Sequence, residues 1–157
     1  MNIKLIWVAK TDQKYLNEGL KIYIDRLKHY VSLRVVEIPA LRGAGSLSKE
    51  EIKEREGREI LKQTGTSDYV ILLDEHGNGY SSKQFAQKLQ TVMNRGTKNL
   101  IFVIGGAFGF SPEVYAVAQE KLSLSDMTFS HQMIRLFFLE QLYRAFTILK
   151  NEPYHNE

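Results

Sequence analysis

The chain has 157 residues, 25% of them charged, with a net charge of +3 and no cysteine. At this length a single domain buries roughly 70% of its unfolded surface, so we expect residues 1–157 to form one domain without a disulfide. The lack of cysteine excludes thiolate nucleophiles and zinc–thiolate sites, and the four histidines do not have metal-ligand spacing, so we expect no metal. No segment has the pattern of a secretory leader or a membrane span, which predicts a cytoplasmic protein.

Short apolar segments alternate with helical patterns along the chain, a rhythm typical of βαβ units and a parallel sheet. Strands are predicted at residues 3–8, 31–38, 69–73, 100–104 and 121–124. Helices are predicted after residue 12, from 48 to about 63, from 81 to before 96, from 111, and from 132 to about 150. The fold class is therefore α/β, a single domain with a mostly parallel five-stranded sheet and helices on both faces. The segment 39–48, which carries Arg42, is interpreted as a mobile surface loop.

The strand at 100–104 runs directly into Gly105-Gly106-Ala107-Phe108-Gly109. Adjacent glycines at the carboxyl end of a strand let a ligand approach the backbone N–H groups closely. The spacing is neither that of the phosphate-binding loop of nucleotide hydrolases nor that of the dinucleotide fingerprint. A tight turn without a ligand therefore stays open as an alternative. What favours a binding loop is that further loops are predicted at the same edge of the sheet.

Two other segments return to this edge. Asp74 and Glu75 follow the strand at 69–73, where they can hold ribose hydroxyls or a cationic ligand, or simply cap the turn. The segment 122–131, Leu-Ser-Leu-Ser-Asp-Met-Thr-Phe-Ser-His, follows the last strand with small and polar residues. Three loops at one edge predict a small-molecule site there.

The predicted final helix is apolar on two sides, which indicates that one side packs on the sheet and another on a partner subunit. Arg135 lies in its first turn, at the start of an otherwise apolar stripe. Because a cation here opposes the helix dipole, we expect an anionic partner, either a carboxylate or a phosphate, and His131 one turn earlier favours the phosphate. The tail after the helix carries Tyr154 and His155, a stacking and a titratable side chain.

Five segments together resemble one known family: Leu72-Leu73-Asp74, Ile104-Gly105-Gly106-x-x-Gly109, Leu124-Ser125-x-Met127-Thr128-Phe129-x-His131-x-x-x-Arg135, Glu140-Gln141-x-Tyr143-Arg144-Ala145 and Pro153-Tyr154-His155. They are similar to segments of the SPOUT-class, trefoil-knotted ribosomal RNA large subunit methyltransferase H family. The resemblance runs along the whole chain. It implies a SPOUT fold with a C-terminal trefoil knot, a homodimer, and S-adenosylmethionine as cofactor. It also implies methylation of N3 of a pseudouridine in helix 69 of 23S rRNA within the assembled 70S ribosome.

The resemblance further implies where the methyl donor binds. The donor site would comprise Leu73, Gly105 and the loop residues Leu124, Ser125, Asp126, Met127, Thr128 and Phe129. The catalytic, substrate-side residues would be His131, Arg135, Tyr154 and His155, with the tail near the donor pocket. Asp126 departs from the small residue expected inside this loop, which leaves the polarity of the loop open.

Methylation at N3 requires loss of the N3 proton, and a neutral histidine or a positioned tyrosine can accept such a proton. Our hypothesis is that His131 or His155 assists deprotonation while Arg135 holds an RNA phosphate or a uracil oxygen. Two other classes stay open from the residues alone. One is a flavodoxin-like nucleotide or flavin binder, which would have a phosphate loop after the first strand. The other is a ribosome-binding factor without catalysis.

Overall fold

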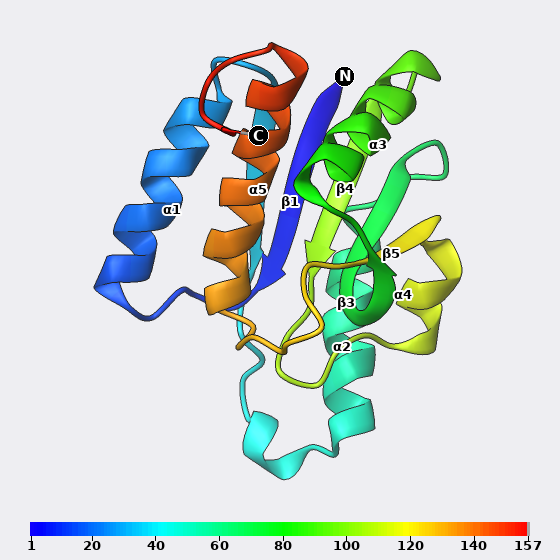
Figure 1. Cartoon of the computed structure of the whole chain (residues 1–157). Coiled ribbons are helices and arrows are strands. Elements are labelled where there is room, and N and C mark those ends of the chain that lie inside the picture. The colour runs from blue at the N-terminus through cyan, green and yellow to red at the C-terminus, as the bar shows by residue number, and fades with distance from the viewer. Residues whose placement is uncertain (157) are drawn as a thin grey trace.

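The computed structural model describes residues 1–156 and contains one five-stranded sheet in the order β2-β1-β4-β3-β5 (Figure 1). The strands are β1 (Asn2–Val8), β2 (Ser32–Ile38), β3 (Tyr69–Gly79), β4 (Asn99–Ile104) and β5 (Glu120–Ser123). Every pair of neighbouring strands is parallel, so all carboxyl ends meet at one edge. This confirms the predicted α/β class and the predicted five-stranded sheet.

The helices are α1 (Lys14–Leu27), α2 (Lys49–Leu61), α3 (Ser82–Asn94), α4 (Pro112–Val117) and α5 (Met133–Leu149). Local sequence explains where three of them begin. Ser48 and Ser81 form capping boxes at the starts of α2 and α3, and Ser111 caps α4 ahead of a first-turn proline. The segment 39–48 contains a short 3₁₀ helix, Ala44–Ser46. None of the helices within residues 1–156 is long and apolar enough to cross a membrane.

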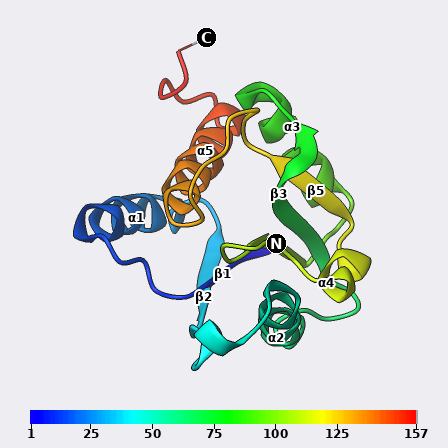
Figure 2. The ribbon, with the colours of Figure 1, turned by 90° about the horizontal axis from the view of Figure 1, so that it is seen from below.

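Alternating side chains of the strands bury into two separate cores, one on each face of the sheet. On β1, Leu5 and Trp7 belong to the core that includes residues of α1, α3 and α5, whereas Ile6 and Val8 belong to the core beneath α2 and α4. Figure 2 shows the two groups of helices on opposite sides of the sheet. Strands of a parallel sheet that is covered on both faces are continuously apolar, and this holds for β4 and for the first half of β3.

Strand β3 extends six residues beyond its predicted end at residue 73. A bulge explains the extension, because Leu73 and Asn78 both pair with Leu122 of β5. Gly77 lies in this bulge, where an added Cβ would stand 2.6 Å from the backbone carbon of Lys121. Only glycine therefore allows β3 to pass this close to β5.

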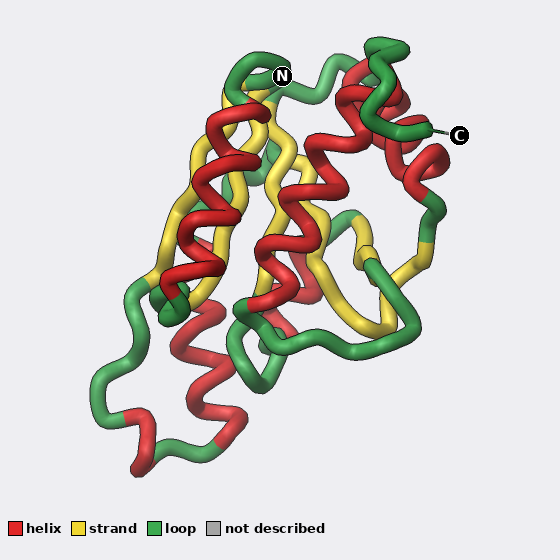
Figure 3. The backbone as a smooth tube through the Cα atoms, turned by 60° about the vertical axis from the view of Figure 1, so that its left-hand side comes forward, coloured by secondary structure: helices red, strands yellow, loops and turns green. Residues whose placement is uncertain are grey.

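The last third of the chain crosses the carboxyl edge of the sheet before it forms α5. In Figure 3, the loop after β5 runs back along that edge to the start of α5, which packs between α1 and α3. The tail after α5 lies at the opposite end of the helix, beside α1 (Figure 1). The two ends of α5 therefore face opposite edges of the sheet.

Candidate active site

A cavity of about 690 Å³ lies at the carboxyl ends of β3, β4 and β5. Leu73, Ile104 and Leu122 form its apolar floor, and the three predicted loops surround it. Its volume is within the range of small-molecule sites, roughly 300–1,000 Å³. No residue of the loop after β1 lines this cavity, so the described part of the chain does not have the arrangement that a flavodoxin-like site requires.

The glycine loop forms a tight turn at the mouth of this cavity. Gly109 has φ +84° and donates its N–H to the carbonyl of Gly106 at 3.2 Å. A Cβ on Gly105 would stand 3.1 Å from the ring of Phe110, and one on Gly106 would stand 2.8 Å from the carboxylate of Glu56. Both glycines are thus closely packed, and they leave bare backbone facing the cavity.

The loop after β5 forms a second wall. Leu124, Ser125, Met127, Thr128 and Phe129 line the cavity, as do Ser130 and His131. The backbone N–H of Met127 donates to Ser125 Oγ at 3.0 Å, a local bond that shapes the loop. Asp126 belongs to the loop but is not among the residues that line the cavity. The predicted donor residues Leu73 and Gly105 also line the cavity, so these segments do converge.

Asp74 and Glu75 lie at the β3 side of the cavity. Asp74 accepts hydrogen bonds from the hydroxyl of Tyr115 and, at 2.8 Å, from the backbone N–H of His76. Burial, together with the bond to Asp74, raises the pKa of Tyr115 to about 12. Both oxygens of Asp74 thus have partners within the chain. No cluster of three His, Asp or Glu side chains within residues 1–156 is suited to hold a metal ion.

His131 lies at the cavity wall just before α5. Burial lowers the pKa of its imidazole below the usual 6.5, and the positive charge of Arg135 lowers it further, while Asp12 opposes the shift. A lowered pKa keeps the ring neutral near pH 7. A neutral imidazole can accept a proton, which is the property a general base needs.

Arg135 has neither of its expected anionic partners, and this corrects the prediction from sequence. The side chain is fully buried, and its guanidinium donates to the carbonyl oxygens of Val8 at 2.6 Å and Ala9 at 3.0 Å and to Thr11 Oγ1 at 2.8 Å. The guanidinium carbon also lies 5.0 Å from the centre of the Trp7 ring. Carbonyl dipoles satisfy the cation, so Arg135 supports the end of β1 and exposes no surface to RNA.

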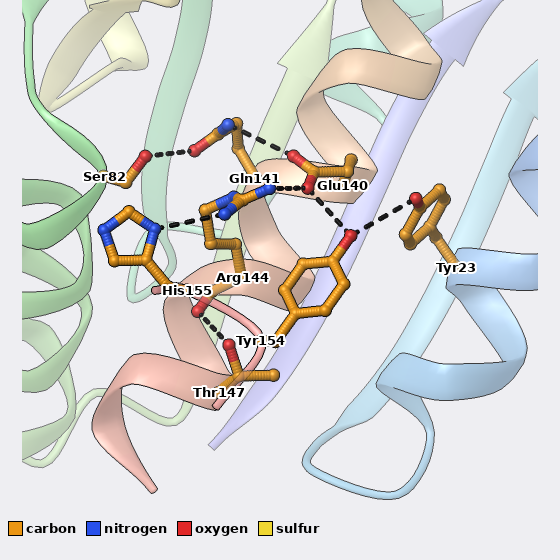
Figure 4. A network of polar contacts seen from close by, with 8 residues as sticks. All are labelled: Tyr23, Ser82, Glu140, Gln141, Arg144, Thr147, Tyr154 and His155. Atoms are coloured by element: carbon orange, nitrogen blue, oxygen red, sulfur yellow. Dashed lines mark hydrogen bonds and ion pairs between the residues drawn. The ribbon is translucent and has the colours of Figure 1, made fainter. Parts of the chain in front are cut away.

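Neither Tyr154 nor His155 lines the cavity of its own chain. Tyr154 donates to Glu140 at 3.0 Å and lies 3.4 Å from the hydroxyl of Tyr23, while Arg144 contacts Nδ1 of His155 at 3.1 Å (Figure 4). These contacts hold the tail against α1 and the middle of α5, at Glu140 and Arg144. His131, by contrast, precedes the N-terminus of α5, so the helix separates the two parts of the expected catalytic set.

Lys49, Lys53 and Phe108 are among the cavity residues that sequence reasoning did not assign to the site. Lys49 and Lys53 line the cavity from α2, and Phe108 lines it from the tip of the glycine loop. In sequence, α2 is a charged helix with mixed signs, a pattern that is typical of a solvated surface. Only the packing of α2 against the glycine loop brings these side chains to the cavity.

The fold and the convergent loops define a class, and comparison with known proteins agrees. The family described as "Predicted SPOUT methyltransferase" matches residues 1–155. Ribosomal RNA large subunit methyltransferase H of Christiangramia forsetii is 56% identical over 156 residues, 99% of both chains. The protein of the same name from Porphyromonas gingivalis ATCC 33277 is 54% identical over 157 residues, 100% of both chains. The chain therefore belongs to the ribosomal RNA large subunit methyltransferase H family of SPOUT methyltransferases.

A solved structure of lower similarity is the SpoU methyltransferase AviRb from Streptomyces viridochromogenes in complex with AdoMet. It is 14% identical, with a TM-score of 0.44, and the alignment covers 96% of this chain and 61% of that one.

Proposed function

We propose that this chain transfers the methyl group of S-adenosylmethionine to N3 of a pseudouridine in helix 69 of 23S rRNA, within assembled 70S ribosomes in the cytoplasm. The observation that carries the proposal is the convergence of three loops and His131 on one cavity. The relatives that match the chain over its full length are named ribosomal RNA large subunit methyltransferase H, which supports rRNA as the substrate.

The residues around the cavity fit a methyl donor of this kind. Leu73, Ile104 and Leu124 offer an apolar surface to an adenine ring, and the bare backbone at Gly105 offers N–H and C=O groups at close range. Ser125 and Thr128 add hydroxyl groups at the rim. When bound, the donor supplies an electrophilic methyl group on a sulfonium. The chain holds that group still and keeps water away from it.

His131 has the properties required to remove the N3 proton. It lines the cavity and its lowered pKa favours the neutral ring, so an imidazole nitrogen can accept the proton that N3 loses. The methyl carbon would then bond to N3 as its bond to the donor sulfur breaks, and the donor would leave as a neutral thioether. Arg135 lies one turn later, and its charge adds to the effect of burial in lowering the pKa of His131. In this proposal Arg135 is a positioning residue for the end of β1 and for His131, and it does not contact the RNA.

Tyr154 and His155 keep their proposed substrate-side role, but they act on the cavity of a second subunit. Tyr154 bonds Glu140, which lies seven residues after the start of α5, about 10 Å along the helix at 1.5 Å per residue, and neither Tyr154 nor His155 lines the cavity of its own chain. A two-fold axis that pairs α5 helices antiparallel would bring each tail to the partner's cavity. Apolar side chains exposed beside the start of α5 support such a homodimer: Met127 (78% exposed), Phe129 (40%) and Phe137 (44%).

The trefoil knot belongs to the same proposal. The chain leaves β5 at the edge of the sheet, runs along the carboxyl ends of the strands and then packs α5 between α1 and α3. Passage of this last segment through the loop that precedes it would form the knot. It would also fix the glycine loop and the loop 124–131 against each other, which a rigid donor site needs.

Calorimetric titration with S-adenosylmethionine, followed by transfer of labelled methyl groups to unmethylated 70S ribosomes, tests the function. Gly105→Val would force its side chain into the Phe110 ring and the cavity, and we expect it to abolish donor binding and methylation. Gly45→Val is the matched control, because nothing lies within 4 Å of a Cβ at that position. Saturable donor binding without any methylation of ribosomes would refute the proposed activity.

A further inference from the structure

One side of the cavity has a composition that the proposed donor site and proton transfer do not use. Phe108, at the tip of the glycine loop, is 42% exposed, and Lys49 Nζ lies 5.4 Å from the centre of its ring. Lys53, one turn further along α2, lines the same side of the cavity. This side of the cavity therefore carries one aromatic ring and two cations.

Close packing fixes this group in place. The tight turn from Gly106 to Gly109 projects Phe108 away from the sheet. Gly106 lies against the Glu56 carboxylate of α2, and a Cβ on Gly57 of the same helix would stand 2.5 Å from Ser111 Oγ, just beyond the loop. Helix α2 thus contacts the glycine segment on both sides of its tip. Figure 2 shows α2 beside the loop that follows β4.

The charges around the cavity are also divided. Asp74 and Glu75 lie at the β3 side, whereas Lys49 and Lys53 lie at the α2 side, with Glu50 as the acidic neighbour of Lys53 at 3.8 Å. An aromatic face with adjacent cations is the usual means of binding single-stranded RNA, in which bases stack on the ring and phosphates meet the lysines. A target base must leave its stack to reach an enclosed site, and this exposes its neighbours.

We infer that Phe108, Lys49 and Lys53 form an RNA-binding platform, on which a base next to the target nucleotide stacks on Phe108 while its phosphates contact the two lysines. This inference rests on the proposed function and adds to it the residues that receive the RNA strand. Because stacking and phosphate contacts carry little base specificity, the platform positions the strand and leaves the choice of the target base to the cavity.

Steady-state methylation of 70S ribosomes tests the platform. The variants are Phe108→Ala, Phe108→Trp as the conservative replacement, and the double variant Lys49→Gln/Lys53→Gln. The matched control is Arg58→Gln/Lys62→Gln, which removes two positive charges at the same spacing from the last turn of α2 and its C-cap. Both side chains are about two-thirds exposed and paired with Glu54 and Glu59. For each protein, kcat, KM for ribosomes, the salt dependence of KM and the Kd of S-adenosylmethionine are measured.

We expect Phe108→Ala to raise KM for ribosomes roughly 5- to 150-fold, the range of one base–aromatic stack. Phe108→Trp should restore KM. The lysine double variant should raise KM and lower the slope of log KM against log salt by about 1.4, the value for two phosphates on a single strand. The Kd of the donor should stay unchanged in all of these variants, and the control should behave like the parent protein.

Two results would overturn the platform. One is a weakened donor Kd in the Phe108 or lysine variants, which would place these side chains on the methyl donor. The other is a KM no higher than that of the Arg58→Gln/Lys62→Gln control. Failure of the proposed function is a separate outcome, because then the parent protein itself would not methylate ribosomes.

Discussion

Replacement of Arg135 by methionine tests whether this residue is structural, as its burial indicates, or contacts RNA. The guanidinium remains protonated at neutral pH, since burial lowers its pKa only to about 10. Three of its hydrogen bonds reach Val8, Ala9 and Thr11 at 2.6–3.0 Å. Ala9 has φ +70°, a left-handed conformation that costs about 1–2 kcal/mol, and the bond to its carbonyl helps to hold it.

The expected magnitude follows from these contacts. Hydrogen bonds to a charged donor contribute about 1.5–3 kcal/mol each, so three of them amount to roughly 4.5–9 kcal/mol. Methionine fills much of the space and removes the desolvation cost of a buried cation, which offsets several kcal/mol. We therefore expect Arg135→Met to lower the free energy of unfolding by about 2–4 kcal/mol.

Urea denaturation at a fixed protein concentration measures this loss, with the fluorescence of Trp7 as the probe. Trp7 is the single tryptophan of the chain, is 5% exposed and contacts Arg135. With a slope of about 2 kcal/mol per molar urea, the midpoint should fall by about 1–2 M. Arg135→Lys should recover little, because an ammonium cannot reproduce the planar fork of donors. Unchanged stability combined with weaker ribosome binding would refute the structural role and restore the contact with RNA.

Three further predictions concern the site and the sheet. First, kcat/KM should fall as the pH drops below 6.5, since protonated His131 cannot accept a proton. His131→Gln should abolish this loss of activity at low pH and should lower the rate by about 10²-fold. An unchanged pH profile in the variant would exclude His131 as the base. Second, an equal mixture of Gly105→Val and His155→Ala proteins, each inactive alone, should recover about a quarter of the parent activity. Half of the dimers are then mixed, and each mixed dimer holds one intact cavity with an intact partner tail out of two sites. No recovery would contradict a tail that acts across subunits. Third, Gly77→Ala should lower the free energy of unfolding by about 1–3 kcal/mol, because its Cβ meets the backbone of β5. Gly79→Ala, with open space at its Cβ, should lower it by less than about 1 kcal/mol. Equal losses would show that close contact with β5 does not determine the residue at position 77.

Local signals predicted most of the fold. Capping serines, a first-turn proline and the alternation of apolar segments depend on residues within a few positions of each other, so the order of strands and helices along the chain was predictable. The bulge in β3 was not predicted, because it depends on how Gly77 meets β5 more than forty residues later in the chain. The same limit applies to Arg135, whose position at the start of an apolar stripe predicted an anionic partner and not the carbonyl groups that receive it.

By itself, the sequence determined that this protein is a single α/β domain, that three loops meet at one edge of its sheet, and which family its motifs resemble. Only the tertiary structure decided that Arg135 bonds to carbonyls 126 and 127 residues away along the chain, that the tail folds back onto the middle of α5 without lining the cavity, and that α2 brings Lys49 to Phe108. The physical reason is the distance along the chain over which each kind of interaction acts. Backbone preference and periodicity act between near neighbours, whereas the partners of a buried charge or a cavity wall are set by close packing between distant segments.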